Sequence, residues 1–156
     1  MRFDLTAEFE GLVAALERGE VPYAVCGGLA VNIHGHVRST QDIDLLVPRE
    51  ALEAALDTVA GIGFTLRAGP IPFGAGTDRY RELHRASRIL EAEVLTVAFL
   101  VVTPILTSAW ESREVIEWRA HRIPTVSRRG LLEMKRLAGR YQDLADIEAL
   151  EKGADA

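Results

Sequence analysis

Apolar residues recur along the 156-residue chain with two periods, and these periods divide it into predicted helices and strands. Helical spacing predicts a helix over residues 6–18, closed by Gly19, and a second helix over residues 49–60. Short apolar or alternating runs predict strands over residues 23–26 and 42–47, the start of a strand at residues 64–66, and strands over residues 79–83, 86–90 and 94–102. The last three follow one another with no helical pattern between them, so we expect them to form an antiparallel run.

The remaining segments complete an α/β or α+β order of elements. Residues 69–76 are so rich in glycine and proline that they predict an irregular loop, either at the edge of a substrate pocket or as a plain connection. Residues 104–110 predict a short helix, and residues 114–123 predict a further strand or an edge hairpin. Ser127 can cap a helix that Gly139 ends, and a final helical segment follows.

The stretch from residue 23 to residue 47 carries the most specific pattern in the chain. Gly27 and Gly28 end an apolar run, and helical spacing begins at Leu29. Glycines let the backbone turn sharply and approach a bulky group, and the first amides of the following helix lack internal partners. The glycine pair is therefore a candidate phosphate site, although a tight turn alone would also explain it.

Two aspartates at the start of the next strand strengthen this interpretation. The two-residue period of a strand places Asp42 and Asp44 on one face and Ile43 on the other. Two carboxylates on one face repel each other unless a cation lies between them, and Mg²⁺ is commonly held by such carboxylates together with phosphate oxygens. The alternative is that both side chains are simply solvated on an exposed strand face.

The turn before this strand contains two further candidates. The guanidinium of Arg38 could reach a phosphate or pair with the aspartates themselves. Thr40 could donate to a phosphate, and it could equally stabilise the turn. His34 and His36 lack metal-ligand spacing, so we interpret them as turn or surface residues.

Composition narrows the class of protein. With 48% hydrophobic and 26% charged residues, the chain is typical of a soluble globular domain. No membrane span or signal pattern is present in the sequence, so we expect a cytoplasmic protein without a membrane partner. The net charge of −5 argues against a broad nucleic-acid-binding surface but leaves room for a small one. The single cysteine, Cys26, is expected to be a buried thiol without chemistry.

The order of glycine pair, helix, Arg38, Thr40, Asp42 and Asp44 resembles the signature of the polymerase-β-type nucleotidyltransferase superfamily, in its minimal nucleotidyltransferase and AbiEii-like toxin branch. The resemblance implies a nucleotidyltransferase fold with a mixed, mostly antiparallel sheet and helices packed on one side. It also implies a single nucleotidyltransferase-like domain over residues 1–156, whose last ~30 residues form a helical segment.

The resemblance further implies Mg²⁺-dependent transfer of a nucleoside monophosphate from a nucleoside triphosphate to an acceptor hydroxyl on tRNA, a protein or a small molecule. By this match Asp42 and Asp44 are the catalytic and metal-binding residues, and five residues hold the nucleotide: Gly27, Gly28, Arg38, Thr40 and Lys135.

The C-terminal third resembles the closing part of the same branch. There a Ser-capped helix bears a lysine, which matches Lys135 and would face the triphosphate, with Arg140 nearby. Asp143 and Asp146 would anchor the last two helices by hydrogen bonds or ion pairs.

One position departs from the family pattern. Ala98 stands where active relatives carry a third carboxylate that binds the catalytic metal and takes the proton of the attacking hydroxyl. Glu91 and Glu93 lie upstream, but strand alternation gives them the opposite parity, so a bulge would be needed to bring either into the site.

The missing carboxylate leaves competing hypotheses. The protein could be an impaired nucleotidyltransferase, or a non-catalytic nucleotide- and metal-binding relative that acts through a partner protein in a toxin–antitoxin or phage-defence module. A structural domain without a ligand is the third hypothesis.

Overall fold

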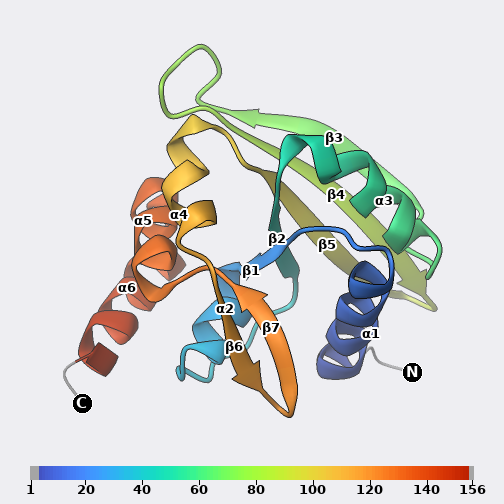
Figure 1. Ribbon diagram of the computed structural model, residues 1–156, viewed down its shortest axis with the longest axis horizontal. Helices are drawn as coiled ribbons and strands as arrows, with labels where there is room; N and C mark the ends of the chain where they lie inside the picture. Colours follow the sequence, from blue (N-terminus) through green and yellow to red (C-terminus); the bar gives the residue numbers. More distant parts are fainter. Residues whose placement is uncertain (1–3, 155–156) are drawn as a thin grey trace.

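In the computed structural model, which describes residues 4–154, the chain folds around one seven-stranded sheet with the strand order β3-β4-β5-β2-β1-β7-β6 (Figure 1). The strands are β1 (Ala24–Cys26), β2 (Ile43–Val47), β3 (Leu66–Phe73), β4 (Arg81–Leu90), β5 (Glu93–Val101), β6 (Glu114–Trp118) and β7 (His121–Thr125). The helices are α1 (Leu5–Arg18), α2 (Gly27–Ile33), α3 (Leu52–Ala60), α4 (Thr107–Glu111), α5 (Arg128–Ala138) and α6 (Tyr141–Ala154). Short 3₁₀ turns at Arg49–Ala51 and Pro104–Leu106 lead into α3 and α4.

The sheet is mixed and mostly antiparallel, which confirms the predicted fold class. Strand β2 lies at its centre, antiparallel to β1 and parallel to β5. The pairs β3–β4, β4–β5 and β6–β7 are antiparallel, and β1 and β7 are parallel. No helix within residues 4–154 has the length and apolar character needed to cross a membrane.

Side-chain alternation gives the two faces of the sheet different environments. Val97 and Phe99 of β5 are fully buried on the face covered by α1 and α3, where Phe9 joins the same core (Figure 1). Ala98 and its same-face neighbour Leu100 instead border a cavity whose other wall is formed by α5. The open side of the central strands is therefore where a ligand can enter.

Two local predictions were wrong. The strand predicted to start at residues 64–66 continues as the edge strand β3 to Phe73, through most of the segment 69–76 that was predicted as an irregular loop, with a register shift between Ala68 and Ile71. An edge strand tolerates proline because one side of its backbone needs no ladder hydrogen bonds. The segments predicted as two strands, 79–83 and 86–90, are one strand, β4.

Glu82 is the centre of a polar cluster on the core-facing side of β4. Its buried carboxylate accepts hydrogen bonds from Arg49 and from the Tyr80 hydroxyl, and lies 2.7 Å from His84 Nε2. The Arg49 guanidinium, followed by His84, lowers the pKa of Glu82 from 4.5 to about 2. The cluster ties β4 to the start of α3 by charge-assisted hydrogen bonds.

Glu82→Gln should make the protein less stable at neutral pH and less sensitive to acid. Because the folded-state pKa of Glu82 lies below its unfolded value, its stabilising effect is complete above about pH 4.5 and is lost as the pH falls toward 2. We expect the free energy of unfolding to differ by about 2 kcal/mol at pH 7, less than the full shift because Arg49 is half exposed and its charge is screened.

Urea unfolding of both proteins from pH 7 to pH 2 measures this difference. Glu117→Gln, on the exposed strand β6, is the control and should change stability little at any pH. A constant difference between wild type and Glu82→Gln down to pH 2 would contradict the assignment.

Candidate active site

The register of the central strands places four residues in one row across the sheet. Asp44 in β2 lies opposite Cys26 in β1 and opposite Ala98 in β5. Ala98 in turn lies opposite Arg85 in β4. Since residues directly opposite one another point to the same face, Asp44, Ala98 and Arg85 share the face that borders the cavity.

Two adjoining cavities bring the predicted site residues together. One has a volume of about 400 Å³ and extends from Gly27 and Asp44 across Ala98 to Arg81 and Arg85. The second opens beside it, toward the turn that precedes β2. All seven residues singled out by the sequence analysis line this second cavity: Gly27, Gly28, Arg38, Thr40, Asp42, Asp44 and Lys135.

The glycine pair is required by the packing of the site itself. Gly27 has φ +64°, and a Cβ atom there would overlap the Asp44 carboxylate. A Cβ atom on Gly28 would lie 2.6 Å from Thr40 Oγ1 and 3.1 Å from the Arg38 guanidinium. The absence of both side chains thus lets β2 and the preceding turn close on the start of α2, which leaves the backbone of Gly27 at the cavity wall.

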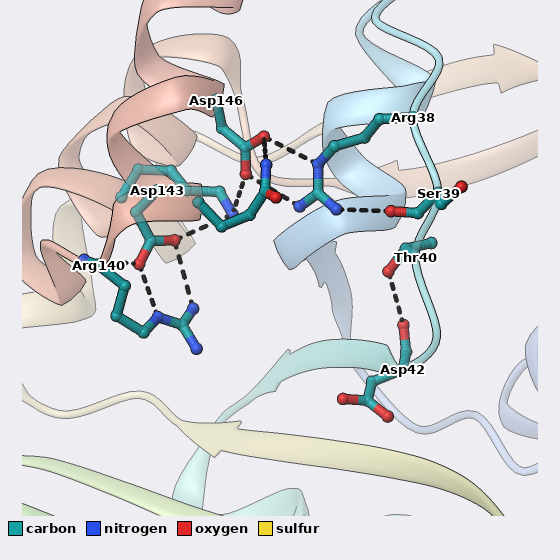
Figure 2. Close-up of polar contacts among 9 residues, drawn as sticks. Arg38, Ser39, Thr40, Asp42, Arg140, Asp143 and Asp146 are labelled. Carbon is teal, nitrogen blue, oxygen red and sulfur yellow. Dashed lines mark hydrogen bonds and ion pairs between the residues drawn. The ribbon is translucent and has the colours of Figure 1, made fainter.

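Asp42, directly before β2, and Asp44, within β2, form a pair of mutually repelling carboxylates. Burial, followed by the negative charge of Asp42, raises the pKa of Asp44 from 3.8 to about 6, against the opposing effect of Lys135, Arg140 and Arg38. Among residues 4–154, neither carboxylate is engaged in a side-chain ion pair. In Figure 2 the Asp42 carboxylate lies apart from the network of Arg38, Arg140, Asp143 and Asp146, and no hydrogen bond or ion pair joins it to them.

A divalent cation fits this donor set. Mg²⁺ prefers oxygen ligands and is commonly held by one or two carboxylates, with phosphate oxygens and waters completing its shell. Residues 4–154 contain no group of three or more histidine, cysteine or acidic side chains that could hold a metal ion. Asp42 and Asp44 would therefore supply part of the shell, and a bound polyphosphate the remainder.

Arg38 and Lys135 are held by two buried aspartates of α6 (Figure 2). Arg38 donates two hydrogen bonds to Asp146, from Nε at 2.8 Å and from Nη2 at 2.9 Å. Lys135 Nζ lies 2.9 Å from Asp146 Oδ2 and 3.3 Å from Asp143 Oδ1. Arg140 completes the network with a 2.7 Å bond to Asp143.

This network decides between the two interpretations of Arg38. Its carboxylate partner is Asp146 rather than Asp42 or Asp44. Burial alone would raise the pKa of Asp146, but the hydrogen bonds from Arg38 and Lys135 outweigh it and lower the pKa. Asp146 therefore stays ionised and orients both cations at the cavity wall.

The turn from Arg38 to Asp42 is fixed by its own hydrogen bonds. Thr40 Oγ1 donates to the carbonyl oxygen of Asp42 at 3.4 Å, as the turn interpretation of Thr40 predicts. The backbone amide of Arg38 donates to Asn32 Oδ1 at 2.8 Å, a contact that the sequence analysis missed. His34 lies 2.9 Å from the carbonyl oxygen of Val126 and so has a structural role.

Comparison with known proteins identifies the fold. No family model matches the chain, and no curated protein matches its sequence. The structure of ANT(2″)-Ia in complex with adenylyl-2″-tobramycin aligns over 95% of this chain and 88% of that one, with 15% identity and a TM-score of 0.66. The chain has a nucleotidyltransferase fold.

Two further solved structures share this nucleotidyltransferase fold. The lincosamide antibiotic adenylyltransferase LnuA, bound to lincomycin, aligns over 93% of this chain and 95% of that one, with 15% identity and a TM-score of 0.60. A candidate nucleotidyltransferase from Thermotoga maritima aligns over 97% and 91%, with 14% identity and a TM-score of 0.57. At these identities the likeness establishes the fold, and the chemistry must come from the site.

Within the nucleotidyltransferase fold, Ala98 leaves the site with two carboxylates beside the glycine turn. Glu93 begins β5 and has the parity of Val97, so it points to the opposite face from Ala98, and Glu91 lies in the turn before it. Five residues of strand also separate Glu93 from Ala98, about 16 Å. The cavity is lined by one further carboxylate from residues 4–154, Asp143, which is paired with Lys135 and Arg140.

Two arginines on the far side of the cavity could not be predicted from the sequence. Arg81 and Arg85 of β4 line it, together with Leu83 between them and Phe73 of β3. Phe73 lies in the segment predicted as an irregular loop, and Arg85 lies in the break between the strands predicted over residues 79–83 and 86–90. The shared face of Arg81 and Arg85 therefore could not be recognised from the sequence.

Proposed function

We propose that the protein transfers a nucleoside monophosphate from a nucleoside triphosphate to an acceptor hydroxyl, with release of pyrophosphate. The proposal rests on one observation: Asp42 and Asp44 border a cavity directly beside the glycine turn at Gly27, with Lys135 on the facing helix. The shared fold with LnuA and ANT(2″)-Ia, which are adenylyltransferases or carry an adenylylated antibiotic, supports the same class of reaction.

In this proposal Asp42 and Asp44 hold Mg²⁺. The bound cation would neutralise charge on the phosphate oxygens of the nucleotide and polarise the phosphorus that is attacked. Gly27 and Gly28 offer backbone without side chains at the wall that would receive the nucleotide phosphates. Thr40 holds the turn that closes this wall.

Arg38 and Lys135 would contact the phosphates from the side of α5 and α6. Both are already oriented by Asp146, so little side-chain entropy is lost when an anion binds. The same aspartates neutralise much of their charge. The site therefore contains three cations, Arg38, Lys135 and Arg140, against four carboxylates, Asp42, Asp44, Asp143 and Asp146. A triphosphate without a divalent cation should consequently bind poorly.

A second candidate function is non-catalytic binding of a metal and nucleotide, acting through a partner protein such as the other member of a toxin–antitoxin or phage-defence module. Ala98 is the observation that favours it, because a methyl group beside Asp44 can neither ligate a metal nor accept a proton. Both candidates share the same nucleotide site and differ in the chemical step. RNA, a protein and a small molecule remain the acceptor classes of the catalytic proposal.

Asp42→Asn and Asp44→Asn should each weaken binding of a nucleoside triphosphate in the presence of Mg²⁺ by at least about tenfold, since each removes a charged ligand of the cation. Calorimetric titration of the four nucleoside triphosphates, with and without Mg²⁺, measures this effect. We expect binding by the native protein to require Mg²⁺.

Asp78→Asn, in an exposed loop, removes the same charge outside both cavities and should leave the affinity unchanged. Equal affinity in the native protein and the Asp42→Asn,Asp44→Asn double variant would rule out this site. No binding by the native protein to any of the four nucleotides would refute both candidate functions.

A further inference from the structure

Arg81 and Arg85 form a second charged feature of the cavity, separate from the aspartates. Strand alternation places them on one face of β4 with Leu83 between them, and all three residues line the cavity. Arg85 lies opposite Ala98, which in turn lies opposite Asp44. Since neighbouring strands are about 4.8 Å apart, the Cα atoms of Arg85 and Asp44 are separated by about 10 Å.

Neither arginine forms an ion pair with an acidic side chain within residues 4–154, although the charge of Asp143 acts on Arg81. The arginines of the site that do form ion pairs are Arg38, with Asp146, and Arg140, with Asp143. Arg81 packs its guanidinium over the Phe73 ring, 5.3 Å from the ring centroid, and its Nε is buried without a hydrogen-bond acceptor among the described residues. Burial, and then the positive charges of Arg79 and Arg140, lower the pKa of Arg81 against the opposing effect of Asp143.

The unsatisfied buried N–H of Arg81 and the repulsion of its guanidinium by Arg79 and Arg140 both cost free energy. An anion held between Arg81 and Arg85 offsets this repulsion and offers Arg81 an acceptor, because a guanidinium fork matches the oxygen atoms of a phosphate in geometry and charge. Phe73 holds the Arg81 guanidinium by a cation–π contact, so the fork is partly oriented in advance.

We propose that Arg81 and Arg85 form a subsite that binds a phosphate group of the acceptor substrate. This inference rests on the proposed nucleotidyl transfer and assigns its acceptor to a chemical class. The acceptor would carry its phosphate near β4 and its attacking hydroxyl near Ala98, within reach of a nucleotide held at Asp42 and Asp44.

The position of the subsite matches the geometry of the reaction. In phosphoryl and nucleotidyl transfer the attacking and leaving oxygens lie roughly in line on opposite sides of the phosphorus. The strand order β4-β5-β2-β1 places Arg81 and Arg85 on one side of Asp44 and the turn at Gly27 and Gly28 on the other. If the pyrophosphate leaves toward the glycine turn, the acceptor must approach from the side of β4.

The same charges disfavour a cationic acceptor. An amine-bearing acceptor in this half of the cavity would meet Arg81 and Arg85 with like charge. Asp143, the carboxylate whose charge acts on Arg81, is already shared by Lys135 and Arg140. The phosphate could belong to a sugar phosphate or to the backbone of an RNA 3′ end, which offer the same chemistry at this subsite.

Binding of phosphate-bearing probes tests the subsite without requiring turnover. The native protein is first saturated with Mg²⁺ and α,β-methylene ATP, and then titrated separately with ribose 5-phosphate, ribose, and a tetraribonucleotide without terminal phosphates. We expect ribose 5-phosphate or the tetranucleotide to bind and ribose not to bind. The tighter of the two phosphate probes identifies the source of the phosphate.

Arg81→Ala and Arg85→Ala should each weaken binding of that phosphate probe about tenfold or more, the effect of losing one charge-assisted hydrogen-bonding group. The affinity for α,β-methylene ATP should stay within about twofold of the native value. Arg81→Lys, which keeps the charge and loses the fork, should have an intermediate effect. Arg122→Ala, at an exposed position of strand β7, is the matched control and should change neither affinity.

The outcomes separate the subsite from the proposed function. If the nucleotide analogue binds and no phosphate probe binds with dependence on Arg81 and Arg85, the subsite is wrong and the nucleotide site stands. If either arginine substitution weakens the nucleotide analogue more than the probe, these arginines belong to the nucleotide and the subsite is again wrong. If the analogue itself does not bind, the proposed function fails and the acceptor subsite falls with it.

Discussion

Ala98→Asp should raise the rate of nucleotidyl transfer by about 10²–10⁴-fold, the range that a positioned general base contributes. Ala98 lies directly opposite Asp44 on the adjacent parallel strand, and its side chain borders the same cavity. A carboxylate there would complete a group of three with Asp42 and Asp44. Pyrophosphate release from each nucleoside triphosphate, measured with Mg²⁺ and with the phosphate-bearing acceptors, gives the rate.

Ala98→Asp should also make the thermal stability of the protein depend on Mg²⁺. Position 98 is 6% exposed, so a new carboxylate would be largely buried beside Asp44, whose pKa is already raised to about 6 by burial and by Asp42. A third negative charge in this position is unfavourable unless a cation binds. We therefore expect Ala98→Asp to lower the melting temperature without Mg²⁺ and to recover most of the loss when Mg²⁺ is added.

Thr96→Asp is the matched control for this experiment. Thr96 lies two residues earlier on the same face of β5 and lines the same cavity, but its neighbour in β4 is Ser87 and it is not opposite Asp44. The same charge placed there should give no gain in rate. An unchanged rate in Ala98→Asp, together with loss of native activity in Asp42→Asn, would indicate that another group acts as the base. Unchanged nucleotide binding with no turnover in either protein would favour the non-catalytic function.

The central part of the site could be predicted because its determinants are local in the sequence. The alternation of Asp42 and Asp44 with apolar residues fixes the face of a strand, and the glycine pair marks the turn before a helix. The parity argument for Glu93 follows from the same period and is confirmed by its register in β5. Each of these inferences needs no more than a few neighbouring residues.

The partners of the charged residues could not be predicted, because they depend on tertiary contacts. Arg38 and Asp146 are 108 residues apart in the chain and meet only when α6 packs against the turn before β2. From the sequence alone, Arg38 could have bound either a phosphate or the nearby aspartates, Asp42 and Asp44. The need for glycine at position 27 could not be predicted either. A side chain there would overlap Asp44 only because β1 pairs with β2.

The arginine pair was missed for a different reason. Strand β4 carries polar residues on both faces: Glu82 and His84 form ion pairs on the core side, while Arg81 and Arg85 face the cavity. This pattern lacks the alternation of apolar and polar residues that indicates a strand, so two shorter strands were predicted with a break inside the important segment. When polar residues on the buried face of a strand form hydrogen bonds or ion pairs with buried partners, the strand no longer alternates between apolar and polar residues. It is then difficult to predict from the sequence.

Asp146→Asn should lower the free energy of unfolding by about 3–5 kcal/mol, the usual cost of removing one member of a buried ion pair. Asp146 and Lys135 are nearly inaccessible, with side-chain exposures of 3% and 6%, and their charged atoms are 2.9 Å apart. Without the Asp146 charge, Lys135 keeps only Asp143, at 3.3 Å, which it shares with Arg140. Arg38 is 26% exposed and can turn toward water, so the cost comes mainly from Lys135.

The ion pair between Arg67 and Asp57 provides the control for this prediction. It has the same 2.9 Å separation but lies on the surface, with side-chain exposures of 40% and 73%. Asp57→Asn should therefore cost only about 0–1 kcal/mol. Chemical denaturation of the two variants and the native protein gives the comparison, and equal effects of the two substitutions would mean that the α6 network does not hold the site together.

A large cost for Asp146→Asn would also bear on nucleotide binding. The network connects the turn at Arg38, helix α5 at Lys135 and helix α6, so its free energy keeps the cationic wall in place before any ligand arrives. If it serves this positioning role, Asp146→Asn should weaken binding of Mg²⁺-nucleotide at a temperature where the variant is still folded, whereas Asp57→Asn should not. Unchanged nucleotide affinity in folded Asp146→Asn would limit the network to stability and remove Arg38 and Lys135 from the binding site.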